Sequence, residues 1–169
     1  MNGKITMDHG SGYGKTSELI ESLFLKFFSG GKLSDQGDSA ILNVPFKNIA
    51  FTTDSFVIKP VFFPGGDIGK LAVCGTVNDL AVSGAVPKYI SCGFILEEGL
   101  PIEELQSIII SMADTAKACG VQIVTGDTKV VEKGACDKLF INTSGIGFIN
   151  EEFIHIPTAE RVSPGYSLN

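Results

Sequence analysis

The apolar and polar residues of this chain recur with a helical period in some stretches and alternate in others. Helical spacing predicts helices over Thr16–Phe28, between Asp67 and Gly84, and from Pro101 to Gly120. Runs of β-branched and aromatic residues predict strands at Ala40–Val44, Ile49–Ile58, Tyr89–Leu96, Val121–Thr125 and Leu139–Ile149. The order of these elements predicts an α/β fold, a two-layer sandwich of a mixed β-sheet with its long helices on one face.

The central helix is the best marked, because a glycine turn stands at each end of it. Asp67 is expected at the N-cap, where its carboxylate would accept free amide groups of the first turn, and Gly84 suits the position after the last turn. Pro87 is expected to keep the helix from resuming. The apolar stripe of this helix is predicted to comprise Leu71, Cys74, Val77, Leu80 and Ala81.

The second face of the predicted sheet is expected to be apolar and to be covered by no helix. Tyr89–Leu96 is nearly continuous in apolar residues, which is typical of a strand buried on both faces. An exposed apolar patch of this size usually binds a partner, and self-association is the commonest answer.

Composition narrows the class of protein. The 169 residues, 44% of them hydrophobic, suffice for one globular domain with a proper core. No apolar run approaches the roughly 18 residues of a membrane-spanning helix, and the first residues lack a signal-peptide pattern. The net charge of −6 argues against nucleic acid as a partner. Four widely spaced cysteines without a Cys-x-x-Cys pair favour a reduced, cytoplasmic protein.

The N-terminal segment Met1–Thr16 is polar and rich in glycine, so we expect a mobile arm. Its Gly-Lys-Thr string suggests a P-loop, but that loop needs a glycine five residues before Gly14, where His9 stands, and a buried strand before it. A flap whose backbone amides close over an anion is favoured instead. His9 is either part of this flap or a solvated loop histidine.

Four aspartates interrupt apolar or glycine-rich surroundings: Asp38, Asp54, Asp79 and Asp127. Asp54 breaks a strand, where aspartate is depleted. Asp79 follows Asn78 late in an apolar helix, where it is either a residue of the exposed face or a ligand. Carboxylates and substrate phosphates are the ligands that Mg²⁺ prefers, and Lys129 can act on phosphate as a point charge. The pattern favours nucleotide-dependent phosphoryl chemistry.

Three stretches carry a family resemblance: HGSG near the N-terminus, TTDSFVIKPVFFPGGDIGKLAVCGTVNDLAVSGAVPKYISCGFILEEGLP, and VTGDTKVVEKGACDKLFINTSGIGFI. They resemble the HypE family of hydrogenase maturation proteins, most densely over Phe51–Ile149. That family belongs to the ATP-binding superfamily that includes aminoimidazole ribonucleotide synthetase and selenophosphate synthetase. Its arm usually reads HGSGG, whereas here Tyr13 follows Gly12.

The resemblance implies an N-terminal domain that binds ATP and Mg²⁺ and whose sheet pairs with that of a second copy in a homodimer to form a β-barrel. It implies that Asp38, Asp54, Asp79 and Asp127 bind the metal, that Lys129 and Asp79 are catalytic, and that the arm is a flap. The nucleotide-binding residues so implied are His9, Gly10, Gly12, Asp38, Asp54, Asn78, Asp79, Gly126, Asp127, Thr128 and Lys129.

The implied family reaction is the ATP-dependent dehydration of a carboxamide on a C-terminal cysteine to a thiocyanate, the source of the cyanide ligand of [NiFe] hydrogenase. The implied partners are HypF, which donates the carbamoyl group, and the HypC–HypD complex. We expect an arm and first helix at 1–37, the ATP-binding and dimerisation domain at 38–150, and the start of a linker at 151–169. No cysteine follows Cys136, so we expect that the chain alone does not complete the reaction.

Two other functions stay open. The chain could be a dimeric scaffold that docks other maturation proteins without catalysis. It could also belong to a sister ATP enzyme such as selenophosphate synthetase, but that resemblance would call for a reactive cysteine or selenocysteine in the arm, and residues 1–16 contain none. Nucleotide binding by a stable dimer separates the enzyme from the scaffold.

Overall fold

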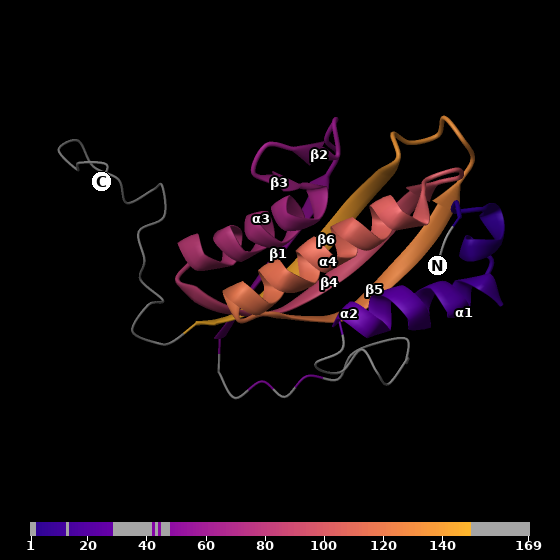
Figure 1. Ribbon diagram of the computed structural model, residues 1–169. Helices are drawn as coiled ribbons and strands as arrows, with labels where there is room; N and C mark the ends of the chain where they lie inside the picture. Colours follow the sequence, from indigo (N-terminus) through magenta and orange to yellow (C-terminus); the bar gives the residue numbers. More distant parts are fainter. Residues whose placement is uncertain (1–2, 13, 29–41, 43, 45–47, 150–169) are drawn as a thin grey trace.

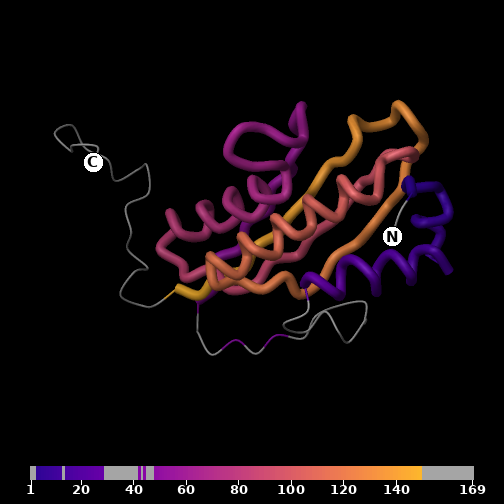
Figure 2. Tube along the Cα trace, in the orientation of Figure 1, coloured from indigo at the N-terminus to yellow at the C-terminus, as the bar shows by residue number. Residues whose placement is uncertain are grey.

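The computed structural model describes residues 3–12, 14–28, 42, 44 and 48–149. These residues form two layers, a twisted sheet with helices on one of its faces (Figures 1 and 2). The predicted strand Ala40–Val44 falls largely outside the described residues, and Asp38 falls outside them altogether. The expected α/β arrangement with a mixed sheet is confirmed.

The main sheet has the strand order β1-β6-β4-β5, so neighbours in space are not neighbours in sequence. Its strands are β1 (Asn48–Phe56), β4 (Ala85–Glu97), β5 (Gln122–Val131) and β6 (Leu139–Ile149). β6 pairs antiparallel with both β1 and β4, whereas β4 and β5 run parallel. β1 and β5 are therefore the two edges of this sheet, about 14 Å apart at the usual spacing between strands.

The helices α3 (Ile68–Val82) and α4 (Ile102–Cys119) cover one face of the sheet, and both predicted helices are confirmed. α4 begins after Pro101 and ends at Gly120, which adopts the left-handed conformation at φ 68°. A hairpin of two short strands, β2 (Phe62–Phe63) and β3 (Gly66–Asp67), precedes α3 and had not been predicted. Two-residue strands are too short to leave a periodic signal.

The N-terminal part forms a third helical element on the same face. The 3₁₀ turn η1 (Met7–Gly10) leads to α1 (Lys15–Leu19), the π-helical segment η2 (Ile20–Leu25) and α2 (Lys26–Phe28). The predicted helix Thr16–Phe28 is thus confirmed, with a π-helical middle. It lies beside β5, and Phe24 packs against Phe94 of β4 with ring centroids 5.0 Å apart.

The N-cap of α3 is confirmed, because Asp67 Oδ1 accepts hydrogen bonds from the amides of Gly69 and Lys70 at 2.7 and 3.1 Å. The predicted apolar stripe was correct for Leu80 and in part for Val77, which is partly buried against the core, and wrong for Leu71, Cys74 and Ala81. Of its members only Leu80 is buried, and the packed face consists of Ile68, Gly69, Ala72, Val73, Thr76 and Leu80. Small residues on this face allow the helix to pack closely against its neighbours. A Cβ on Gly69 would come within 2.6 Å of Met112 Cγ, so α3 lies directly against α4.

The helix does not resume after Gly84, but Pro87 lies in a strand and not in a loop. α3 ends at Val82, Gly84 takes φ 77°, and β4 begins at Ala85, so Pro87 lies inside a strand. The pairing of β4 with β6 shifts register between Pro87 and Tyr89. This irregularity accommodates a residue that has no amide proton for the ladder.

The core lies between the helices and the sheet, and the opposite, open face of the sheet is mixed instead of uniformly apolar. At one end of this face lie Ile49, Phe51 and Val86, which are 50, 66 and 54% exposed. Across its middle runs a polar row in which Thr53, Ser144, Ser91 and Thr125 are successive cross-strand partners. The expectation of an apolar face was thus correct at this end of the sheet and wrong across its middle.

Candidate functional site

The glycine-rich arm is anchored to the domain, so the prediction of a mobile arm was wrong for residues 3–12. Ile5 is fully buried. Its amide donates to Leu100 O at 2.8 Å, and its carbonyl accepts from the amide of Gly99 at 2.8 Å. A Cβ on Gly10 would come within 2.9 Å of the Val130 amide nitrogen, so the turn η1 lies directly on β5.

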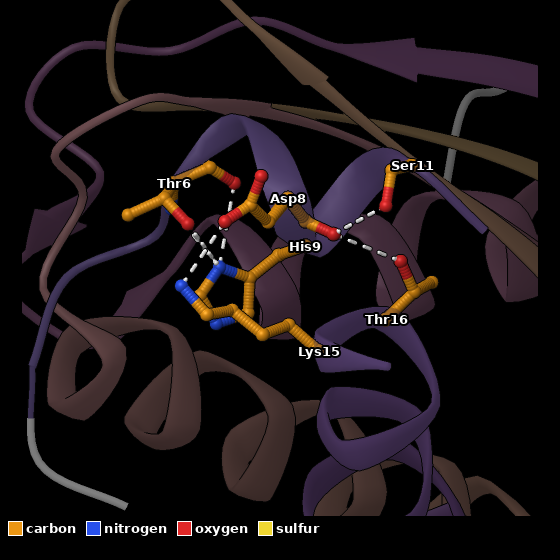
Figure 3. A network of polar contacts seen from close by, with 6 residues as sticks. All are labelled: Thr6, Asp8, His9, Ser11, Lys15 and Thr16. Carbon is orange, nitrogen blue, oxygen red and sulfur yellow. Dashed lines mark hydrogen bonds and ion pairs between the residues drawn. The ribbon is translucent and has the colours of Figure 1, made fainter. Parts of the chain in front are cut away.

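His9 is buried, with 6% of its surface exposed, and is not a solvated loop histidine. Its Nδ1 accepts a hydrogen bond from the Thr6 amide at 3.0 Å and lies 2.9 Å from Thr6 Oγ1 (Figure 3). The ring therefore closes the first turn of η1 as part of a capping box. This contact gives His9 a structural role in shaping the arm.

A second set of contacts joins the arm to α1. The carbonyl of Asp8 accepts from Ser11 Oγ at 2.8 Å and from Thr16 Oγ1 at 3.2 Å, and Thr16 Oγ1 accepts from the Gly12 amide at 3.0 Å. Lys15 Nζ lies 3.2 Å from Asp8 Oδ2. These bonds tie η1 and Gly12, where φ is 86°, to the start of α1.

A cavity of about 320 Å³ opens between the arm, the N-terminal helix and β5. Its apolar part includes Phe24, Phe28, Cys92 and Phe94, and its polar part includes Gly10, Gly12, Thr16 and Gly126–Lys129. The structure thus brings together six residues of the predicted nucleotide site, namely Gly10, Gly12, Gly126, Asp127, Thr128 and Lys129. Apolar walls with a few polar groups are typical of small-molecule sites.

Asp127 and Lys129 lie at the β5 edge of the sheet. Both belong to β5, which extends past the predicted end at Thr125 to Val131. Lys129 Nζ lies 3.3 Å from Asp127 Oδ1, and both side chains are about two-thirds exposed. An ion pair this exposed contributes little stability, so both groups are free to exchange partners with a ligand.

Asp54 and Asp79 lie at the opposite edge, where α3 packs on β1. Asp54 Oδ2 lies 3.4 Å from Thr76 Oγ1, and Asp79 Oδ2 accepts from Thr52 Oγ1 at 3.1 Å. Thr52 and Asp54 share one face of β1 because they are two residues apart. Both carboxylates therefore lie at the α3–β1 contact, each bonded to a threonine of the other element, with Asn78 exposed beside Asp79.

The predicted metal ligands fall into two places. Asp54 and Asp79 lie at the β1 edge, Asp127 lies at the β5 edge, and Asp38 is outside the described residues. Within the described part of the chain, no three His, Cys, Asp or Glu side chains gather in a metal-binding group. One chain thus presents an acidic pair at one edge and an Asp–Lys pair at the other. Sequence reasoning missed the threonines, although Thr76 interrupts an apolar helix face.

Cys92 is fully buried in β4 beneath the cavity, and burial raises the pKa of its thiol to about 12. The thiol is therefore neutral at physiological pH and should not react as a nucleophile. We expect that brief alkylation of the native protein, followed by mass spectrometry, will label the exposed Cys119 and leave Cys92 unmodified. In denaturant both should be labelled; equal labelling in the native state would contradict the burial of Cys92.

Among the described residues, no helix has both the length and the apolar character needed to cross a membrane.

Comparisons with known proteins identify the family. Residues 36–149 match the family model described as AIR synthase related protein, N-terminal domain. Carbamoyl dehydratase HypE of Escherichia coli K12 is 58% identical over 150 residues, which cover 86% of this chain and 45% of that protein. The crystal structure of hydrogenase maturation protein HypE in complex with ATP matches with a TM-score of 0.90 and 51% identity, over 94% of this chain and 47% of that one.

A crystal structure of a HypE–HypF complex also matches, with a TM-score of 0.61 and 57% identity over 79% of this chain and 43% of that one. The chain spans less than half the length of these relatives. The resemblance to HypE that the sequence motifs carry is confirmed. The chain therefore belongs to the AIR synthase related family, whose N-terminal domain it carries, and within that family it is similar to HypE.

Proposed function

We propose that this chain is the ATP-binding and dimerising half of an ATP-dependent carbamoyl dehydratase of the HypE type. The full reaction would convert the S-carboxamide of a C-terminal cysteine into thiocyanate, for the cyanide ligand of [NiFe] hydrogenase. The observation that carries the proposal is the match to a HypE structure in complex with ATP, at a TM-score of 0.90 and 51% identity.

The donor set of the acidic pair fits Mg²⁺. Asp54 and Asp79 offer carboxylate oxygens at the α3–β1 contact, and one oxygen of each accepts a hydrogen bond from a threonine hydroxyl. Mg²⁺ binds through one or two carboxylates together with substrate phosphates. When bound, the ion would offset negative charge on the phosphates.

The Asp–Lys pair is proposed to act on the phosphates themselves. Lys129 would leave Asp127, 3.3 Å away, for a phosphate oxygen, and its flexible stem permits this exchange. The arm would close the site with the amides around Gly10 and Gly12. The anchoring of the arm through Ile5 and His9 would hold these amides in place.

A second copy of the chain is proposed to complete the site. The acidic pair and the Asp–Lys pair lie at opposite edges of one sheet, about 14 Å apart by strand spacing. If two open faces pack together about a two-fold axis, the β5 edge of one copy can meet the β1 edge of the other. The exposed Phe51 and Ile49 at one end of this face would supply the apolar contact.

The partners proposed for the full-length protein are HypF, as carbamoyl donor, and the HypC–HypD complex. A complex with HypF exists for a HypE that is 57% identical to this chain over the matched part. The scaffold function remains the second candidate, because the exposed apolar end of the sheet would support a dimer even without nucleotide.

Calorimetric titration with Mg²⁺–ATP tests the proposal. We expect the parent chain to bind and Asp79→Asn to weaken binding by about tenfold or more, because a charged ligand is lost while its shape is kept. Asp114→Asn, which removes one charge from the exposed surface of α4, is the matched control and should bind as the parent does. A folded dimer that binds no nucleotide would instead favour the scaffold.

A further inference from the structure

We propose that two buried threonines, Thr76 and Thr143, position the carboxylate of Asp54 for a divalent cation, and that Thr52 does the same for Asp79. These threonines would act on the metal through the carboxylates and would not touch it themselves. The inference rests on the proposed function, since it assumes that the acidic pair holds the cation.

The contacts of the two buried hydroxyls fix the direction of the Thr143 proton and leave the Thr76 proton two acceptors. Thr76 and Thr143 are both fully buried, and their Oγ1 atoms lie 2.5 Å apart. Within the described residues Thr76 is the polar partner of the Thr143 hydroxyl, so Thr143 donates its proton to Thr76. The proton of Thr76 is then left for the Ala72 carbonyl at 3.1 Å or Asp54 Oδ2 at 3.4 Å.

Packing alone does not require hydroxyl groups at these two positions. Valine has nearly the same shape as threonine and would fill either position without a polar atom to satisfy. Burying a hydroxyl is unfavourable unless it is hydrogen-bonded, and here two are buried in series behind a carboxylate. A pair of this kind is expected where the direction of the carboxylate matters.

The backbone is also shaped to bring the threonines close. A Cβ on Gly145 of β6 would come within 2.5 Å of Thr76 Cγ2 and 3.4 Å of Thr52 Cγ2. A Cβ on Gly75 would likewise come within 2.9 Å of the Phe56 ring. α3 therefore lies unusually close to β6 and β1, and this close approach puts Thr76 within reach of Asp54.

Asp54 and Asp79 have the same pattern of hydrogen bonds on their carboxylates. One oxygen of each carboxylate, Oδ2, has a threonine hydroxyl as its partner. The other oxygen has no polar partner among the described residues and is available to a cation. Hydrogen bonds from such outer groups typically change metal affinity by about 10–100-fold.

Titration with Mn²⁺, followed by electron paramagnetic resonance of the free ion, tests this inference on the chain without turnover. We expect Thr143→Val to weaken Mn²⁺ binding about tenfold, while Thr143→Ser, which keeps the hydroxyl, stays within about threefold of the parent. Thermal unfolding without metal shows whether either variant has lost the fold. If Thr143→Val does not fold, Thr52→Val on the more exposed edge strand tests the positioning role in its place. We expect it to weaken Mn²⁺ binding by the same factor of about ten.

The outcomes separate this inference from the proposed function. If Asp54→Asn abolishes Mn²⁺ binding but Thr143→Val binds as the parent does, the positioning role is wrong and the metal site stands. Equal losses in Thr143→Val and Thr143→Ser would also overturn the inference, because shape and not the hydroxyl would then matter. If the parent binds no Mn²⁺, or Asp54→Asn binds as well as the parent, the positioning role is overturned, and the Mg²⁺–ATP titration decides the proposed function separately.

Discussion

Gly126→Ala should destabilise the domain by about 2–3 kcal/mol, the cost of forcing an extra methyl into a close-packed place. A Cβ on Gly126 would come within 2.4 Å of the carbonyl oxygen of Cys92, a backbone atom in the central strand β4. A backbone group within a hydrogen-bonded sheet cannot move aside as the end of a flexible side chain can. For a domain of this size the loss corresponds to roughly 5–10 °C in melting temperature.

Gly93→Ala is the matched control for this prediction. Gly93 pairs with Asp127 one position further along the same strands, and a Cβ there would meet no atom closer than 3.8 Å. Its effect should stay below about 1 kcal/mol. Thermal unfolding of both variants and of the parent measures these two effects as changes in melting temperature. Equal melting temperatures for Gly126→Ala and the parent would mean that β5 can shift to admit the methyl group and that the sheet does not require glycine here.

The role of Gly126 in the sheet could not be predicted from the sequence alone. The predicted strand ends at Thr125, and the Gly-Asp-Thr-Lys stretch after it stands out because Asp127 and Lys129 are predicted to bind metal and phosphate. In the structure the stretch is part of a strand, because its pairing with β4 overrides the low strand propensity of Gly126 and Asp127. One residue of the motif thus has a packing reason that no local pattern could reveal.

The elements with strong periodic or capping signals were predicted well. Leu139–Ile149 matches β6 to the residue, and Pro101 and Gly120 delimit α4. The exposed face of α3 was mistaken for its packed face, because hydropathy favoured Leu71 over the small residues that permit close contact. Hydropathy predicts that α3 is buried, whereas the packing of its side chains against β1, β6 and α4 determines which face of the helix is buried.

The arrangement of the candidate site depended on topology. Asp54, Asp79 and Asp127 stood out in the sequence because each interrupts apolar or glycine-rich surroundings. Their separation to opposite edges follows from the strand order β1-β6-β4-β5, which the order of elements in the sequence does not specify. The Thr76–Thr143 contact joins residues 67 positions apart, so it too was invisible before the fold was known.

If a second copy completes each site, two variants that fail separately should restore binding when mixed. Asp79→Asn would damage the β1 edge of a site and Asp127→Asn the β5 edge. In a mixed dimer one site would carry both substitutions, and the other would combine an intact β1 edge with an intact β5 edge. Random exchange gives about half mixed dimers, so about a quarter of the parent number of Mg²⁺–ATP sites should return.

Calorimetric stoichiometry measures this recovery directly, with each variant alone as the baseline and the parent as the full value. The two variants are refolded together so that subunits exchange, and the dimer mass is checked before titration. Recovery to about a quarter of the parent number of sites follows from the two-edge geometry, because one site of each mixed dimer combines the intact β1 edge of one chain with the intact β5 edge of the other. A site built within one chain would stay defective in every dimer and give no recovery. Strong binding by Asp127→Asn alone would remove the β5 edge from the site altogether.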